Sequence, residues 1–373
     1  MIVFLCNAEP LSREWLGYYR AFERRGTVLC WGPGVKGRPG WKPNRSVEEL
    51  LAACPKPPRL VLHPDGSSFL PKQLEKIGVP TACFQIDTHA YLHRRLQWAM
   101  LFDYTFLFHP GFEEPFRAAG HPNPITLPHA VDQFIFLDEP VAPERNIDVG
   151  WVGRIGGPLY GLRRKILPIL AANFPMNDWR QSYPYPEMAK LYRRSKVGVN
   201  IGRDDYPQDA NLRVYEIMAA GAMLITALPS ELEKLGFQSG THFAGYRDES
   251  ELSDRIRYYL EHDAERARIA ETGRGLVLAE HTYDQRADEI LRLLDKDEGR
   301  LFAPARSWPE ERVRQTYLDY YCANDLLGCA FEEFRRLALI RPTTAWKSLP
   351  PILGGLRRVV KNRYMNSART ARK

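Results

Sequence analysis

The sequence predicts an α/β protein built from two Rossmann-like halves. From the first residue onward, short apolar runs of strand length alternate with helical patterns over about 130 residues. The alternation stops at a proline-containing stretch and starts again at Ile147. Strands that alternate with helices predict parallel sheets with crossover helices. A chain of 373 residues is also long for one hydrophobic core and suits two domains with an extension.

The first half is expected to form a domain over residues 1–132. Its six apolar runs are IVFLC, TVLCW, RLVLH, TACFQI, YTFLFH and ITLP. Helical patterns separate them at residues 12–26, 46–54, 70–78, 91–102 and 112–120. Prolines and mixed charges over residues 133–146 then indicate a linker.

The second half, residues 147–300, repeats this order. Its strand candidates are IDVGWVG, KVGVNIG and AMLITA, with a short MNDW between the first two. Its helix candidates cover 159–174, 186–195, a segment ending at Gly221, 228–236 and a long stretch at 251–273. Helix formers and aromatic residues continue over 301–340 as a helical extension, and 341–373 form a basic tail.

The positive charge of the chain is concentrated in that tail. Residues 341–373 contain nine Lys and Arg and no Asp or Glu, whereas the preceding residues contain 43 Lys and Arg against 45 acidic residues. The near-neutral body argues against a nucleic-acid partner. The apolar run followed by a one-signed end is typical of a segment that lies on an anionic membrane, although a solvated tail has the same composition.

The spacing of the cysteines and the hydropathy of the sequence indicate the cellular compartment of the protein. The six cysteines form no CxxC pair and no zinc spacing, which suits a reducing compartment. The first residues lack the pattern of a signal peptide, and no stretch approaches the ~18 apolar residues of a membrane span. We therefore expect a cytoplasmic protein.

The most informative segment runs from Gly202 to Thr226, as a polar loop, a helix, a glycine stop and a buried strand. This order places the helix at the carboxyl edge of a sheet, where open α/β folds bind ligands. Asp209 or Asn211 can cap the start of this helix, and Gly221 can end it. Its apolar face, which we expect to point inward, consists of Val214, Ile217 and Met218. Arg213 and Glu216, three residues apart, share a face. The alternative interpretation is a surface ion pair of little energetic value.

The string NLRVYEIMAAGAMLIT resembles the donor-site signature of GT-B glycosyltransferases, in particular the CgeB-like and group 1 subset. The resemblance implies two Rossmann-like domains that face each other across a cleft, with C-terminal helices. It also implies that Glu216 accepts hydrogen bonds from the nucleotide ribose, and that the preceding loop, with Asp209 and Asn211, faces the diphosphate and sugar. Larger retaining families have an acidic residue where this chain has Gln208. The sugar contact and the stereochemistry therefore stay open.

Two further segments of the second half are donor-site candidates. After IDVGWVG, the loop with Gly153 and Arg154 is rich in glycine and precedes a helix, so its amides and guanidinium suit a diphosphate. A tight turn is the alternative interpretation. Tyr183 and Tyr185 resemble the stretch where the donor base stacks in the GT-B family, although aromatic packing explains them equally well.

In the first half, Asp87, Thr88 and His89 directly follow a strand. Together with LFDYTFLFH and LPHAVD, they resemble CgeB-like proteins over residues 84–132. His89 is then a candidate to take the acceptor proton or to contact the donor phosphates, with Asp87 orienting it. A capping or core histidine is the alternative. A metal site of Asp87, His89 and His93 is a weaker one, because HAYLH lacks the glutamate of HExxH.

These observations predict a glycosyltransferase that moves a sugar from a nucleotide-diphosphate donor, a UDP-sugar first, to a hydroxyl of a glycan, lipid or protein. Residues 1–132 would bind the acceptor and the second half the nucleotide. No metal is required in this interpretation, because arginines and helix amides can stabilise the leaving diphosphate. Two alternatives remain: a sugar-nucleotide-binding scaffold without transfer activity, and a sugar-nucleotide epimerase of the same fold.

Overall fold

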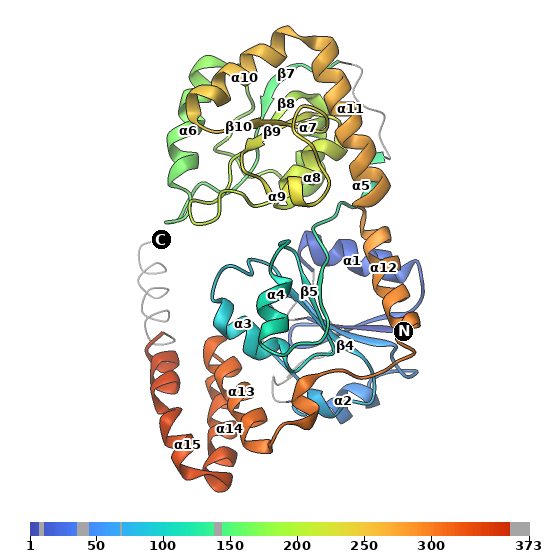
Figure 1. Ribbon diagram of the computed structural model, residues 1–373, viewed down its shortest axis with the longest axis vertical. Coiled ribbons are helices and arrows are strands. Elements are labelled where there is room, and N and C mark those ends of the chain that lie inside the picture. Colours follow the sequence, from blue (N-terminus) through green and yellow to red (C-terminus); the bar gives the residue numbers. More distant parts are fainter. Residues whose placement is uncertain (7–10, 36–44, 68, 138–143, 359–373) are drawn as a thin grey trace. The chain divides into compact units, whose positions relative to one another are not determined.

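The computed structural model describes residues 1–6, 11–35, 45–67, 69–137 and 144–358 (Figure 1). The chain forms two compact units. Unit 1 comprises residues 1–11, 22–126 and 292–373, and unit 2 comprises residues 12–21 and 127–291. Helix α1 (Arg13–Glu23) is therefore divided, and its first nine residues belong with unit 2.

Unit 1 is built on a six-stranded parallel sheet of order β2-β1-β3-β4-β5-β6. The six strands predicted for the first half are confirmed, as β1 (Ile2–Leu5), β2 (Val28–Trp31), β3 (Leu60–His63), β4 (Thr81–Gln85), β5 (Tyr104–Leu107) and β6 (Pro124–Thr126). The crossover helices are α2 (Val47–Ala52), α3 (Leu92–Ala99) and α4 (Glu113–Ala118). Strands β1, β3, β4 and β5 are buried along their whole length, as expected when helices cover both faces of a parallel sheet.

Unit 2 is built on a four-stranded parallel sheet of order β10-β9-β8-β7. Its strands are β7 (Ile147–Gly150), β8 (Ser195–Asn200), β9 (Met223–Ala227) and β10 (Ala244–Tyr246). Its helices are α5 (Gln133–Leu137), α6 (Gly161–Asn173), α7 (Tyr185–Arg194), α8 (Leu212–Ala219), α9 (Glu231–Lys234), α10 (Glu249–Glu261), α11 (Asp263–Glu280) and α12 (Tyr283–Lys296). The first nine residues of α12 lie in unit 2, because unit 1 resumes at Arg292.

Several predicted elements differ in the structure. The helix predicted at 70–78 is wrong: only a 3₁₀ turn, η1 (Leu74–Lys76), forms there, because Pro71 has no N–H and Gln73 has a left-handed φ of 64°. The long helix predicted at 251–273 is broken at His262 into α10 and α11. Strand β10 was not predicted, since three residues containing a glycine carry too little periodicity.

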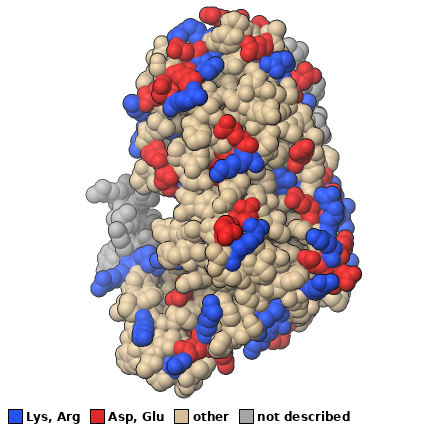
Figure 2. Space-filling model, in the orientation of Figure 1, with Lys and Arg blue, Asp and Glu red and all other residues tan. Residues whose placement is uncertain are grey.

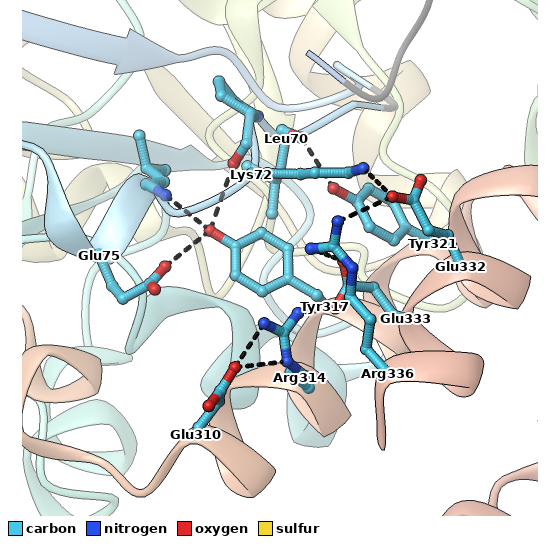
Figure 3. Close-up of polar contacts among 12 residues, drawn as sticks. Leu70, Lys72, Glu75, Glu310, Arg314, Tyr317, Tyr321, Glu332, Glu333 and Arg336 are labelled. Atoms are coloured by element: carbon cyan, nitrogen blue, oxygen red, sulfur yellow. Dashed lines mark hydrogen bonds and ion pairs between the residues drawn. The ribbon is translucent and has the colours of Figure 1, made fainter. Parts of the chain in front are cut away.

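The C-terminal extension packs on unit 1 through α13 (Glu310–Ala323) and α14 (Leu327–Ile340), followed by α15 (Pro342–Lys347). Figure 3 shows buried polar contacts that connect α13 with the segment before β4. The Tyr317 hydroxyl accepts the Leu74 N–H at 2.9 Å and lies 3.0 Å from the Glu75 carboxylate. The neighbouring Tyr321 hydroxyl donates to the Leu70 carbonyl at 2.9 Å. The extension is thus part of the core of unit 1.

We expect Tyr317→Phe to destabilise the protein by about 1–3 kcal/mol, because the buried Leu74 N–H and Glu75 carboxylate would lose a partner. Urea unfolding followed by circular dichroism measures this change. The matched control is Tyr258→Phe, which removes a hydroxyl bonded to Glu265 on the surface and should cost less than about 0.5 kcal/mol. Equal losses in the two variants would show that the Tyr317 contacts are not special.

Candidate functional site

Helix α8 has well-defined ends that fix its position at the sheet edge of unit 2. At its start, the Asn211 side chain accepts a hydrogen bond from the Arg213 N–H at 3.1 Å, so the cap is Asn211 and not Asp209. At its end, Gly221 adopts a left-handed φ of 73°. The N–H of Gly221 donates to Met218, and the next N–H donates to Ile217, which is a Schellman motif. The predicted glycine stop is confirmed.

The carboxylate of Glu216 is completely buried within this helix. Its Oε1 lies 3.0 Å from Nη1 of Arg13, an ion pair whose geometry does not make a hydrogen bond. Among the described residues, neither carboxylate oxygen accepts a hydrogen bond. Burial raises the pKa of Glu216 to about 7, although Arg13 and Arg213 act in the opposite direction. A buried carboxylate with open acceptor positions is costly unless a ligand supplies donors, and two adjacent hydroxyls of a sugar would do so.

Arg13 was missed by the sequence analysis. It is partly exposed, lies in unit 2 with Glu216, and places its guanidinium 5.6 Å from the ring centre of Tyr185. It also donates to the Met188 sulfur at 3.5 Å. Arg13 therefore contacts both Glu216 and Tyr185, the first residue of α7. Nothing in the sequence distinguishes Arg13 from a surface arginine at the start of an amphipathic helix.

Arg213 does not pair with Glu216, so the alternative of a surface ion pair between them is wrong. Its Nε donates to the Val152 carbonyl at 2.5 Å, and its Nη1 donates to Asn200 Oδ1 at 2.9 Å. Its guanidinium also lies 5.6 Å from the ring centre of Trp151. Arg213 therefore connects α8 with the ends of β7 and β8.

Gly153 is required for this connection. A Cβ at that position would lie 2.4 Å from Nη2 of Arg213 and 3.0 Å from the Trp151 ring. A larger residue would displace Arg213 from the loop. The predicted phosphate loop is thus shaped partly by packing, and its role toward a ligand stays a prediction.

Arg154, next in this loop, is exposed, and among the described residues it donates only to the nearby Gly156 carbonyl, at 3.1 Å. Beneath it, the buried Arg163 donates to the carbonyls of Arg154 and Ile201, both at 2.9 Å. Burial and the charge of Arg213 lower the pKa of Arg163 to about 10, so it remains a cation at neutral pH. The guanidinium of Arg154 is therefore exposed, and the backbone of Arg154 is held by the positively charged Arg163.

The start of α6, which we expected to attract a phosphate, already holds a carboxylate. Asp204 accepts the Gly161 N–H at 2.7 Å and the Leu162 N–H at 3.0 Å. Asp204 is thus a capping residue for this helix. In the loop that leads to α8, Asp209 is buried, and its N–H donates to the Tyr206 carbonyl.

In unit 1, Asp87, His89 and His109 come together at the carboxyl ends of β4 and β5. Their ligand atoms all lie within 4.8 Å of one another, and the two imidazole rings are 5.5 Å apart. Asp87 has a left-handed φ of 47°. The cap position of α3 is Tyr91, so His89 is not the helix cap, and His93 is exposed and lies outside the cluster. Two imidazoles and a carboxylate can orient a proton acceptor, and they are also a ligand set that transition metals accept.

A cavity of about 190 Å³ lies in the same unit, at the ends of β3 and β4. Its wall includes Asp65 and Arg95, whose charged groups are 2.8 Å apart, and the ring of Trp98. Within the described part of the chain, the buried Nε1 of Trp98 has no hydrogen-bond partner. Arg95 also donates to the Ala90 carbonyl at 3.0 Å, so the cavity wall supports the turn that carries His89.

The chain is similar to known proteins in part of its sequence and in its fold. Residues 142–292, which include α8 and Glu216, match the family model described as glycosyl transferase-like. HepE of Anabaena, solved in complex with UDP-glucose, is 14% identical with a TM-score of 0.55 over 79% of this chain and 99% of that chain. Sucrose-phosphate synthase of Thermosynechococcus elongatus is 12% identical with a TM-score of 0.54, over 79% and 98% of the two chains. No curated protein sequence matches the chain.

A glycosyltransferase of Rickettsia africae is 8% identical with a TM-score of 0.57, again over 79% of this chain and 98% of that chain. At these identities the likeness establishes the fold, so the predicted GT-B class is confirmed. The family match indicates a glycosyl transferase-like domain over residues 142–292.

We expect Glu216→Gln to remove a cost of burying charge. Folding raises the pKa of Glu216 from 4.5 to about 7, so the folded protein holds this proton more tightly than the unfolded chain. The free energy of unfolding of the parent should therefore fall as pH rises from about 4.5 through about 7, by about 3 kcal/mol in total. The variant should lack this decline, and urea unfolding at pH 5 and pH 8 measures it.

Glu251→Gln is a control of opposite sign for this pH profile. Hydrogen bonds from the Arg247 N–H and from Arg255 lower the pKa of Glu251. The parent should therefore gain stability relative to that variant as pH rises through the acidic range. If Glu216→Gln and the parent have parallel stability profiles between pH 5 and pH 8, the carboxylate is not buried as described.

Proposed function

We propose that the protein is a glycosyltransferase that moves a sugar from a nucleotide-diphosphate donor to a hydroxyl of a glycan, lipid or protein acceptor. The observation that carries this proposal is the buried Glu216 carboxylate, which has open acceptor positions at the edge of the sheet in unit 2. Nucleotide ribose offers two adjacent hydroxyl donors at the spacing that one carboxylate can accept. Unit 2 is then the nucleotide domain.

The remaining donor-site residues are assigned from their surroundings. Tyr185 and Arg13 lie beside Glu216, where a base can stack on the ring. Arg213 and Asn211 hold the loop of Gly153 in place and position α8. The exposed Arg154 is the proposed diphosphate partner, since its guanidinium matches phosphate oxygens, and Asp209 is a candidate for the sugar side.

The residues of unit 1 are proposed to act on the acceptor. The acceptor oxygen forms a bond to the anomeric carbon, the bond from that carbon to the diphosphate oxygen breaks, and the nucleoside diphosphate leaves with the electron pair. The imidazole of His89 takes the acceptor proton, and Asp87 orients the ring. The cavity beside the His89 turn, with its indole and its charged wall, is of a kind that suits the sugar unit of an acceptor.

Finer assignments extend this proposal. HepE has been solved with UDP and with UDP-glucose, which makes a UDP-sugar the first donor to test and a hexose the first sugar. The motifs favour the CgeB-like subset and a role in making cell-surface glycan. We further propose that the protein works in the cytoplasm without a required metal, with its basic tail at the inner face of the membrane. Residues 359–373 of that tail lie outside the described part of the chain.

One nucleotide diphosphate should stand out in a thermal-shift screen of UDP, GDP and dTDP, with CMP included, because a ligand that binds only the folded state raises the melting temperature. Glu216→Ala should weaken binding of that nucleotide by roughly 10- to 150-fold, the effect of losing about 1.5–3 kcal/mol of hydrogen bonding to a charged acceptor. A folded variant that binds as tightly as the parent would make Glu216 purely structural.

The same preparations separate the two alternatives. A scaffold without transfer activity would bind the nucleotide sugar but leave it intact, so slow donor hydrolysis argues against that function. An epimerase would convert the donor sugar in the absence of any acceptor, which product analysis by NMR detects.

His89→Ala should lower kcat by roughly 10²- to 10⁴-fold while changing donor affinity little, because it removes the proposed proton acceptor. Asp87→Asn should act in the same direction with a smaller effect. His93→Ala is the matched control, since His93 is exposed and lies outside the cluster. Unchanged activity per folded molecule in His89→Ala would return His89 to a structural role.

A further inference from the structure

Exposed apolar side chains are concentrated on the C-terminal helices. Of the twelve large hydrophobic residues that are exposed in the described part of the chain, six lie between Phe331 and Leu356. Leu339 is 87% exposed and Trp346 is 68% exposed, values that are unusual for such side chains in a soluble domain. The six residues are Phe331, Leu339, Ile340, Trp346, Leu353 and Leu356.

The periodicity of α14 separates an inward from an outward face. Ala330, Glu333 and Leu337 are buried, and α14 packs through this face against α13 and unit 1. Phe331 and Leu339 are eight residues apart and therefore lie on the opposite face. Arg335, which falls between them at i+4, is exposed on this same outward face.

The helical residues 342–347 and 349–358 repeat this pattern. Ala345 and Gly355 within these helices, and Ser348 between them, are buried. Their outward positions carry Trp346, Lys347, Leu353 and Arg357, all of them exposed. The two helices thus each present apolar and basic side chains outward, and we call these outward residues the C-terminal face.

The unpaired charges of this face have one sign. The only acidic residues between Leu327 and Arg358 are Glu332 and Glu333. Glu332 pairs with Lys72 and Arg336, and the buried Glu333 pairs with Arg314 (Figure 3).

Lys and Arg supply the charge that remains. In the described part of the chain, no ion pair involves Arg335, Lys347 or Arg357, each of which is exposed. Figure 2 draws the region of α13 to α15, at the lower left, mostly in tan, with separate blue residues and a few red ones. The C-terminal face therefore combines apolar area with uncompensated positive charge.

We propose that the C-terminal face docks onto the surface of an anionic lipid bilayer. A tryptophan and exposed leucines can enter the headgroup boundary, while the long Arg and Lys side chains reach the lipid phosphates. No helix in the described residues is both long and apolar enough to cross a bilayer, so the contact is made along the surface. The sequence beyond Arg358 adds five Lys and Arg and no acidic residue, which extends the same charge.

Charge also decides against the main competing occupant, a second copy of this chain. Two identical C-terminal faces would bring Arg335, Lys347 and Arg357 toward their own copies without acidic partners, and like charges at an interface disfavour it. An anionic bilayer instead gains from each basic residue, by about fivefold in binding for each Lys or Arg near the surface. The proposal stands independently of the glycosyltransferase activity.

Flotation of the full-length protein with vesicles tests this proposal. We expect recovery with phosphatidylcholine vesicles that contain phosphatidylglycerol at low salt, little recovery with phosphatidylcholine alone, and less recovery as NaCl is added. The variant Leu339→Ser/Trp346→Ser should lose most of the binding. The variant Arg335→Gln/Lys347→Gln/Arg357→Gln should lose roughly a hundredfold in apparent affinity.

The matched control is Ile169→Ser/Leu301→Ser, which removes exposed apolar residues away from the C-terminal face and should float as the parent does. All the substituted residues are exposed, so melting temperatures should stay close to that of the parent. Failure of the parent to float with anionic vesicles overturns the proposal, and so does parental recovery of Leu339→Ser/Trp346→Ser. A dimer in sedimentation velocity that this variant converts to monomer, with no lipid binding, would assign the face to a second copy.

Discussion

The burial of the Glu216 carboxylate is the constraint on which the organisation of unit 2 depends. An ionised group without hydrogen bonds in the interior is unfavourable, and here burial outweighs two nearby arginines in setting its pKa. The helix that holds this carboxylate is capped at both ends, by Asn211 and by the left-handed Gly221. A carboxylate that is buried in a fixed position, although its burial is unfavourable, is typical of a binding site, because a ligand can donate the hydrogen bonds that the protein does not.

The side chains of the C-terminal extension fall into two groups, one buried and one exposed. Inward, the Tyr317 hydroxyl connects α13 with the segment before β4, and the buried Glu333 carboxylate pairs with Arg314 and so connects α14 with α13. Outward, the apolar residues around Leu339 and Trp346 contribute nothing to that packing because they are exposed. Stability therefore does not account for the outward residues, and a contact with another surface does. The same periodicity that builds the core of unit 1 leaves the opposite face free for the bilayer.

Local signals in the sequence predicted much of the fold, and distant contacts limited the prediction of the site. The strands of both sheets, the glycine stop of α8 and a capping residue at its start follow from patterns within a few residues. The ion-pair partner of Glu216 does not follow from such patterns, since Arg13 lies near the amino terminus and only tertiary packing brings it to Glu216. His109 was missed for a similar reason, although its position at the end of the strand beside β4 was a usable signal.

The Asp204 carboxylate at the start of α6 limits where the proposed diphosphate would bind. A helix start attracts an anion because its first N–H groups lack partners, but the Asp204 carboxylate already accepts two of them. Its negative charge would repel a phosphate at that position. Positive charge nearby is instead carried by the buried Arg163 and by Arg154, whose guanidinium is exposed in the glycine loop. The arrangement therefore favours recognition of a diphosphate by the Arg154 side chain over recognition by the amides of α6.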